Sequence, residues 1–251
     1  MSGELKALQW NIGGGRILGE GQDPGRMSSY SRDGIEQIID VIGNEEPDIV
    51  TLQETHPPIP GGIAKVLGYE HSVNHEVSSS HIDKTQRLGH GLVTNFPIMH
   101  DQLDVLTYPT LPEGTDTTPH DKGISTYKLR LENGEKLTCQ NLHLFPFGYY
   151  GIGRQDSPEI ETILREVEVI AGFHSGKRIL QGDFNLDTRS LRSLLPGLFE
   201  VGLEEVEQEE ETTPTDKRID HVLFAGITVV RSFVVKNVLT DHYPLVTTFA
   251  T

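Results

Sequence analysis

The stretch KRILQGDFNLDT, residues 177–188, places polar side chains directly after a short apolar run. The apolar part has the composition of a buried strand, and Asp183, Asn185 and Asp187 follow it on alternate positions. A carboxylate that a strand end holds rigidly can orient or deprotonate a water molecule, and a neighbouring amide can bind a phosphate. The simpler alternative is a turn in which these side chains bond to nearby backbone groups. Asp187 is interpreted as a turn residue or a helix cap.

Further polar residues lie where other predicted strands begin or end. A single Asn, Asp or Glu at such a position is more often a turn or capping residue. The ends of several strands can nevertheless converge on one rim of a sheet scaffold, which is the usual place for chemistry. Together with Asp183 and Asn185, we therefore interpret these residues as one candidate site: Asn11, Glu54 and His143 at strand ends, Asp220 inside RIDHVLF, and Asp241 and His242 before the last strand.

The residue types in this set indicate hydrolysis of a phosphoester. Carboxylate and amide oxygens suit Mg²⁺, and imidazoles can compensate the charge that develops when water attacks phosphorus. Neither a cysteine cluster nor HExxH is present to indicate zinc, and no GxxxxGK[ST] or GxGxxG indicates a nucleotide-binding fold. The glycines at 13–15 are equally compatible with a phosphate loop and with a flexible turn.

Composition narrows the class of partner. The chain has 37 acidic and 21 basic residues, a formal net charge of −16, which disfavours holding long nucleic acid by charge alone. A phosphate substrate remains compatible with this charge, because bound divalent cations can reverse the sign locally. The sequence indicates no obligate protein partner.

Length and cysteine usage predict one domain in a reducing compartment. The 251 residues contain no low-complexity linker and no internal repeat, so we expect a single domain, residues 1–251. The one cysteine, Cys139, excludes an internal disulfide framework and is expected to be a small core side chain. No run approaches the ~20 apolar residues of a membrane span, and the N-terminus lacks the pattern of a secretory signal. We therefore expect a cytoplasmic protein.

Strands dominate the predicted elements. The clearest signal is a hairpin over residues 123–144, turning at Asn133-Gly134. Helical spacing predicts one helix over 35–43 and another from Ser157 to about residue 174, and polar composition predicts a loop over 75–88. The pattern is typical of an α/β (α+β) fold with two packed sheets flanked by helices. Other strands are expected at 5–11, 48–53, 91–98 and 177–181, in RIDHVLFA and ITVVRSFVV, and in the final YPLVTTFA.

Seven stretches, in this order, resemble the endonuclease/exonuclease/phosphatase superfamily, which has the DNase I-like fold. They lie between residues 8 and 245, nearly the whole chain, and are LQWN, DIVTLQET, GLVTNFPI, NLHL, LQGDFNLD, KRIDHVLF and TDHYPL. QET, GDFN and DH together are specific for the family but not for a substrate. The resemblance implies a four-layered αββα sandwich, with two mainly antiparallel sheets flanked by helices and a metal-dependent site on one edge.

The resemblance also implies roles for the candidate residues. Glu54 would be the main Mg²⁺ ligand, with Mn²⁺ able to substitute for the metal. Asn11 would support the same metal directly or through water, and Asp241 would complete the set. One metal or two remains open.

The remaining residues would act on the phosphoryl group. Asp183 would orient or deprotonate the attacking water, and Asn185 would bind the phosphate beside it. His143 and His242 would donate to the phosphoryl oxygens. Asp220 would fix the tautomer of His242 and raise its pKa.

Two features depart from the family pattern. Several relatives have an acidic residue where this chain has His90, so the carboxylate partner of His143 is not identified. The segment FPFGYYGIGRQD, residues 145–156, matches no subfamily signature. Its Phe147 and Tyr149 could stack on a base or sugar of the substrate, or pack onto the core. Arg154 could contact a phosphate or be an ordinary surface arginine.

The favoured interpretation is a Mg²⁺-dependent phosphoesterase that cleaves phosphodiester or phosphomonoester bonds by metal-assisted in-line attack of water. The substrate is a phosphoester, with nucleic acid as one candidate, so the chain is either a nuclease (an endonuclease or exonuclease) or a phosphatase acting on small esters. The alternative is a catalytically inactive binding or scaffold protein with the same fold. Such a protein is expected to lose residues at the rim, whereas this chain keeps the complete set.

Overall fold

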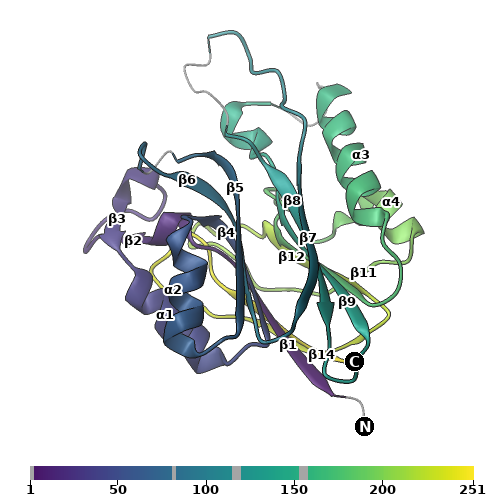
Figure 1. Ribbon diagram of the computed structural model, residues 1–251. Helices are drawn as coiled ribbons and strands as arrows, with labels where there is room; N and C mark the ends of the chain where they lie inside the picture. Colours follow the sequence, from purple (N-terminus) through teal and green to yellow (C-terminus); the bar gives the residue numbers. More distant parts are fainter. Residues whose placement is uncertain (1–2, 81–82, 115–119, 153–157) are drawn as a thin grey trace.

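The computed structural model of the chain describes residues 3–80, 83–114, 120–152 and 158–251. Two six-stranded sheets pack face to face, and helices cover the outer face of each (Figure 1). The expected four-layered αββα sandwich is confirmed.

The first sheet is built around a parallel pair of strands. β1 and β4 run side by side, with Asn11 opposite Gln53, and every other neighbouring pair in this sheet is antiparallel. The ends of β1 and β4 therefore reach the same edge of the sheet. In sheet order the strands are β13 (Thr228–Val234), β14 (Leu245–Ala250), β1 (Glu4–Asn11), β4 (Ile49–Thr55), β6 (Arg87–Thr94) and β5 (His71–Ser79).

The second sheet repeats this arrangement. Its parallel pair is β9 and β10, which places His143 opposite Asp183, while antiparallel β12 places Asp220 opposite Asp183 from the other side. Three candidate residues thus lie in one row across three neighbouring strands. In sheet order the strands are β11 (Glu204–Glu205), β12 (Asp220–Ala225), β10 (Arg178–Asp183), β9 (Lys136–His143), β8 (Gly123–Arg130) and β7 (Ile98–Val105).

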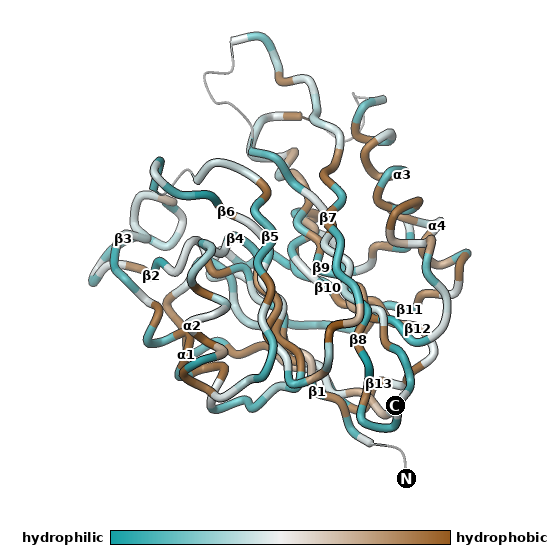
Figure 2. Tube along the Cα trace, viewed as in Figure 1, coloured by the Kyte–Doolittle hydropathy of each residue, from teal (hydrophilic) through white to brown (hydrophobic). Residues whose placement is uncertain are grey.

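In the part of the chain that the structure describes, each outer layer consists of two helices. α1 (Ile35–Glu45) and α2 (Pro58–Leu67) cover the first sheet, and α3 (Pro158–Gly172) and α4 (Pro196–Glu200) cover the second (Figure 1). Hydrophobic and hydrophilic residues alternate along α3 in Figure 2, the pattern of a helix that buries one face. None of the helices in the described ranges is long and apolar enough to cross a membrane.

Short elements complete the described chain. A two-stranded sheet and four 3-10 turns lie in the loops that connect the larger strands and helices. They are β2 (Arg16–Leu18), β3 (Tyr30–Asp33), and turns at Gly13–Gly15, Met27–Ser29, Phe147–Tyr150 and Leu191–Ser193.

The interface between the sheets changes from apolar to polar towards the candidate site. Its apolar part includes Cys139, which is fully buried as expected, and burial raises the pKa of this thiol to about 12. Nearer the site, buried amides bridge the two sheets: Gln53 Nε2 donates to Asn141 Oδ1 at 2.6 Å, and Gln181 Nε2 donates to Thr51 Oγ1 at 2.9 Å. Such bonds are strong at low dielectric and fix the position of one sheet relative to the other.

Two expectations for the strands are wrong. The predicted loop over 75–88 instead contains the end of β5 and the start of β6, and β7 was not expected as a strand. β5 and β7 are edge strands, and their exposed faces carry polar residues that conceal the alternation on which strand prediction depends. The hairpin of β8 and β9 is confirmed. The expected helix cap at Ser157 lies outside the described residues.

Candidate active site

The candidate residues gather at the edge where both parallel strand pairs end. A cleft of about 740 Å³ opens there, within the range of ordinary ligand-binding clefts. Asp220 lies fully buried behind it. The candidates that line the cleft are Asn11, Glu54, His143, Asp183, Asn185, Asp241 and His242.

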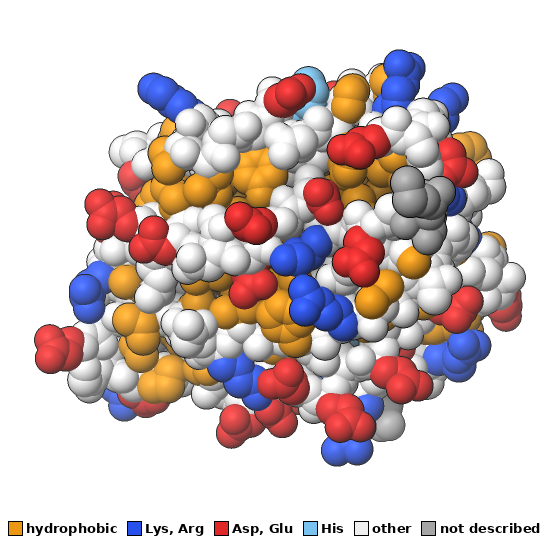
Figure 3. All heavy atoms as spheres, turned by 90° about the horizontal axis from the view of Figure 1, so that it is seen from below, with side chains coloured by type: hydrophobic (Ala, Val, Ile, Leu, Met, Phe, Trp, Pro, Cys, Tyr) orange, Lys and Arg blue, Asp and Glu red, His pale blue; other side chains and the backbone are white. Residues whose placement is uncertain are grey.

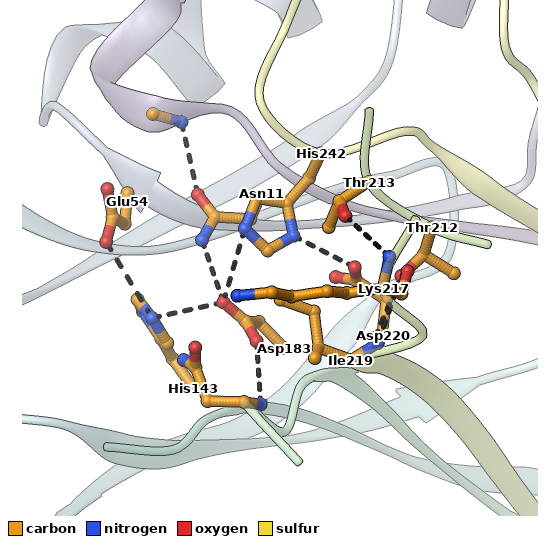
Figure 4. A network of polar contacts seen from close by, with 12 residues as sticks. Asn11, Glu54, His143, Asp183, Thr212, Thr213, Lys217, Ile219, Asp220 and His242 are labelled. Atoms are coloured by element: carbon orange, nitrogen blue, oxygen red, sulfur yellow. Dashed lines mark hydrogen bonds and ion pairs between the residues drawn. The ribbon is translucent and has the colours of Figure 1, made fainter. Parts of the chain in front are cut away.

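Asp183 occupies the centre of the site (Figure 4). Its Oδ2 accepts a hydrogen bond from Asn11 Nδ2 at 3.0 Å, and its Oδ1 accepts one from the backbone N–H of Asn185 at 2.8 Å. Two imidazoles face the same Oδ2, with His143 Nε2 at 3.4 Å and His242 Nε2 at 3.7 Å. Burial raises the pKa of Asp183 to about 6, although the positive charges of His242 and Lys122 oppose this shift. The carboxylate is therefore rigidly held and more basic than an ordinary aspartate.

His242 is held between two carboxylates. Its Nδ1 lies 2.9 Å from Asp220 Oδ2, and the other oxygen of Asp220 accepts a hydrogen bond from Gln9 Nε2 at 2.9 Å. Burial lowers the pKa of His242, but the negative charges of Asp220 and Asp183 outweigh it and raise the pKa well above its usual value. His242 is accordingly an imidazolium near neutral pH. Its Nε2–H faces Asp183 Oδ2 in the cleft.

The three residues that the resemblance assigned to a metal, Asn11, Glu54 and Asp241, all line the cleft with Asp183. The Oδ1 of Asp241 is a buried oxygen without a hydrogen-bond partner among the described atoms. A Cβ added at Gly13 would lie 3.0 Å from that oxygen, so glycine leaves room for the carboxylate. Burial raises the pKa of Asp241, and the charge of Glu54 raises it further. An unpaired buried carboxylate oxygen beside a second carboxylate fits a divalent cation.

Glu54 and Asn185 both have left-handed backbone conformations, each with a φ of 50°. This region is unfavourable for residues other than glycine, and at functional sites it marks a side chain whose direction the surrounding structure enforces. Glu54 adopts it near the end of β4, where the pairing with β6 shifts register between Leu52 and Thr55. The bulge turns the Glu54 side chain into the cleft.

A different group, which the resemblance did not assign to a metal, meets the distance requirement of a metal site. One ligand atom from each of Asp183, Asp220 and His242 can be chosen so that all lie within 4.8 Å of one another. The hydrogen bond between His242 Nδ1 and Asp220 already occupies part of this group. The unpaired oxygen of Asp241 favours the set of Glu54, Asn11 and Asp241.

Lys122 is a site residue that the sequence reasoning did not assign. Its Nζ lies 3.5 Å from Glu54 Oε1 and 2.7 Å from His143 Nε2. Lys122 directly precedes β8, and no local spacing in the sequence links it to the other candidates. Its position follows from the pairing of Gly123 with His143 across β8 and β9.

His90 lies behind His143, where a carboxylate was missing from the sequence pattern. The two rings are 6.4 Å apart, and His90 Nδ1 lies 2.9 Å from Ser125 Oγ. Burial, with smaller contributions from Lys122 and His75, lowers the pKa of His90 to about 3. Among the described residues, the carboxylates of Asp183 and Glu54 lie close to His143 Nε2, at 3.4 and 3.7 Å.

Replacing His90 by Asn is expected to reduce the acid sensitivity of the fold. Unfolded His90 takes up a proton below about pH 6.5, whereas the folded residue stays neutral down to about pH 3. Wild-type stability should therefore fall by about 2 kcal/mol from this residue between pH 7 and pH 5. Asn has no such titration, and its amide can replace the Nδ1 contact with Ser125. Urea unfolding of both proteins at the two pH values measures the difference, and equal losses would contradict a neutral buried His90.

The aromatic residues after β9 divide into two groups. Phe147 is 5% exposed and packs in the core beneath α3, so the expectation that it stacks on substrate is corrected: its ring is turned inward. Tyr149 is 71% exposed and lines the cleft together with Tyr150. Arg154 lies outside the described residues.

Comparison with known proteins finds a matching family model and two relatives of similar sequence. A model of the Endonuclease/Exonuclease/phosphatase family matches residues 8–242. The UPF0294 protein of Vibrio campbellii (strain ATCC BAA-1116) is 25% identical across 98% of this chain and 78% of its own length. A UPF0294 protein of Vibrio parahaemolyticus is 29% identical over 124 residues, which are 48% of this chain and 42% of that protein.

Solved structures share the fold at low sequence identity. An endonuclease/exonuclease/phosphatase from Beutenbergia cavernae has a TM-score of 0.72 and 18% identity over 98% of this chain and 71% of its own. The mannosyl-6-phosphatase Bt3783 of Bacteroides thetaiotaomicron has a TM-score of 0.67 and 18% identity, over 98% and 100%. D. rerio TDP2, complexed with a single-strand DNA product, has a TM-score of 0.66 and 17% identity, over 99% of both chains.

Proposed function

The chain belongs to the endonuclease/exonuclease/phosphatase family, and from this membership we propose that it is a metal-dependent phosphoesterase. The observation that carries the proposal is the arrangement around Asp183. A buried carboxylate of raised pKa faces two imidazoles, one of them held as a cation by Asp220. Beside it lie the carboxylates of Glu54 and Asp241.

In the proposed reaction Asp183 accepts a proton from the attacking water. Its pKa of about 6 leaves it ionised at pH 7 yet close enough to neutrality to be an efficient base. The oxygen of the water forms a bond to phosphorus as the bond to the ester oxygen on the opposite side breaks. The Nε2–H of His242 and the imidazole of His143 donate to the phosphoryl oxygens. The departing ester oxygen takes up a proton from a solvent water, and Asp183 returns the proton it accepted to solvent. Asn185 holds the phosphate beside Asp183.

The donor set of Glu54, Asn11 and Asp241 fits Mg²⁺, with Mn²⁺ able to substitute. When bound, the cation would supply positive charge that compensates the charge developing on the phosphoryl group. The Oδ1 of Asn11 already accepts a hydrogen bond from the backbone N–H of Gly13 at 3.1 Å, and its second lone pair is available to the metal or to a water.

Charge in and around the cleft favours small or single-stranded esters over long duplexes. Five acidic residues and two lysines line the cleft, which gives no extended cationic track for a polyanion. Both termini lie at the end of the molecule opposite the site (Figure 1). The face at that end carries basic side chains interspersed with acidic ones (Figure 3). Proteins of similar fold include a mannosyl-6-phosphatase and one with a single-strand DNA product, so fold alone leaves both branches open.

Hydrolysis of a mixed substrate panel, with Mg²⁺ or with EDTA, tests the proposed function. The panel contains single- and double-stranded oligonucleotides, an abasic duplex, a generic phosphodiester and sugar and inositol phosphates. We expect hydrolysis with Mg²⁺ that EDTA abolishes. Cleavage of oligonucleotides would identify a nuclease, and cleavage of small esters alone would identify a phosphatase. Absence of all hydrolysis, together with absence of Mg²⁺ binding by calorimetry, would instead support the inactive scaffold. The cytoplasmic location stays part of the proposal.

A further inference from the structure

Three aromatic side chains form a connected group on the wall of the cleft, directly after His143. Phe145 is buried and stacks on Tyr150, with ring centroids 4.8 Å apart and planes inclined by 21°. Tyr150 in turn contacts Tyr149 edge to face at 5.0 Å and 84°. The core thus supports Tyr150 and Tyr150 supports Tyr149, so the outermost ring is held by packing although most of its surface is accessible.

Tyr149 is exposed although its neighbours in the aromatic segment pack inward. A tyrosine that served only the core would bury its ring, as Phe147 does two residues earlier. Tyr149 keeps 71% of its surface accessible within a cleft that also contains the catalytic groups. An accessible, supported ring offers a π-face to a planar partner at low entropic cost.

Electrostatics around these rings favour a neutral planar group over a second phosphate. Tyr149 and Tyr150 line the same cleft as five acidic residues, Glu54 among them. Two lysines and the imidazolium of His242 line the cleft. Lys122 is engaged by Glu54 and His143, and His242 is engaged by Asp220 and Asp183, which leaves Lys217. A charged extension of the substrate would find little compensation beside the tyrosines.

We propose that Tyr149, supported by Tyr150 and Phe145, forms a subsite that stacks on a planar aromatic group carried by the phosphoester substrate. This deepens the proposed function and rests on it. The group is either a nucleobase or an aryl ring of a small ester, since both present the same π-face. A cleft of about 740 Å³ accommodates a ligand of nucleotide size.

Matched substrates isolate the contribution of the ring. Thymidine 5′-monophosphate and deoxyribose 5-phosphate differ at C1′, where a hydroxyl replaces the base. Benzyl phosphate and cyclohexylmethyl phosphate differ in the planarity of the ring while both keep an alkyl leaving group. Each is assayed as the monoester and as its methyl diester. We expect kcat/KM to be ~5- to 150-fold higher for the aromatic member of at least one pair. A preference confined to the thymidine pair identifies a nucleobase, and one confined to the benzyl pair identifies an aryl ester.

Variants of Tyr149 then assign the preference to this residue. Tyr149→Ala and Tyr149→Leu should bring the ratio of kcat/KM between the aromatic and non-aromatic members of the pair to about one, and Tyr149→Phe should keep the ratio of the wild type. Phe173→Ala is the control, because Phe173 is 85% exposed at the end of α3 and does not line the cleft. Equal rates within both pairs, or a preference that survives Tyr149→Leu, would overturn the inference while leaving the phosphoesterase intact.

A binding measurement keeps the inference separate from catalysis. In the Asp183→Asn variant with Mg²⁺, calorimetry should show tighter binding of thymidine 5′-monophosphate than of deoxyribose 5-phosphate, or of benzyl than of cyclohexylmethyl phosphate. The Tyr149→Leu change in the same background should abolish the difference. If the wild type hydrolyses no ester but the difference in binding remains, the proposed function fails and the aromatic subsite stands. If binding shows no difference, the subsite fails.

Discussion

Replacing Asp183 by Asn is expected to lower kcat by ~10²- to 10⁴-fold, because the amide cannot accept a proton from the attacking water. The change keeps the size and planarity of the side chain, and its oxygen can still accept a hydrogen bond from Asn11 or from the backbone N–H of Asn185. Binding of substrate should therefore change much less than turnover. The measurement is kcat and KM with whichever ester of the panel is hydrolysed fastest.

The free energy of unfolding at pH 7 should not fall on the same substitution. The pKa of Asp183 is raised to about 6 in the folded protein, above the value of an unfolded aspartate, so folding disfavours its ionised form. This cost is present at pH 7 and disappears as pH falls through the two pKa values, where both states are protonated. A neutral amide avoids it, and the free energy of unfolding at pH 7 should be unchanged or higher in Asp183→Asn.

Asp187→Asn provides the matched control for Asp183→Asn. Asp187 is an exposed acid four residues further along the chain, lines the same cleft, and accepts a hydrogen bond from the backbone N–H of Arg218 that an amide oxygen can also accept. Its replacement should alter kcat by no more than about twofold. Full turnover by Asp183→Asn, or an equal loss in both variants, would remove Asp183 from its role as base.

The candidate site could be predicted from the sequence to the extent that its residues occupy strand ends. Asn11, Glu54, His143 and Asp183 each follow an apolar run, and the two parallel strand pairs carry them to one edge. Residue type and position relative to the strand are local properties that a sequence displays. Convergence on a shared edge then follows from the fold.

Contacts across the sheets could not be predicted in this way. Lys122 contacts Glu54, 68 positions earlier, and nothing near either residue in the sequence indicates the pair. Phe147 and Tyr149 illustrate the same limit at short range, since both follow His143 in one aromatic segment. A 3-10 turn at Phe147–Tyr150 directs the first ring into the core and leaves the second accessible. Which ring packs depends on α3 and the strands beneath it, not on the segment alone.

Replacing Glu54 by Gln is expected to lower activity in Mg²⁺ by ~10²- to 10⁴-fold, the range that loss of several kcal/mol of charge stabilisation implies. The amide keeps the shape of the side chain but removes the negative charge that a divalent cation requires beside Asp241. Wild-type protein in EDTA should lose activity to a similar extent, and EDTA should have little further effect on the variant.

Thermal unfolding supplies a readout of Glu54 that does not depend on activity. A ligand at 100 times its Kd stabilises the folded state by about 2.7 kcal/mol, so saturating Mg²⁺ should raise the Tm of the wild type. Glu54→Gln should abolish most of this rise, whereas Glu207→Gln, which neutralises an exposed acid in the 204–211 run, should preserve it. If Mg²⁺ stabilises Glu54→Gln as strongly as the wild type while Asp220→Asn loses the effect, the cation is held instead by Asp183, Asp220 and His242. Their 4.8 Å grouping allows that outcome, but the unpaired oxygen of Asp241 argues for the set that includes Glu54.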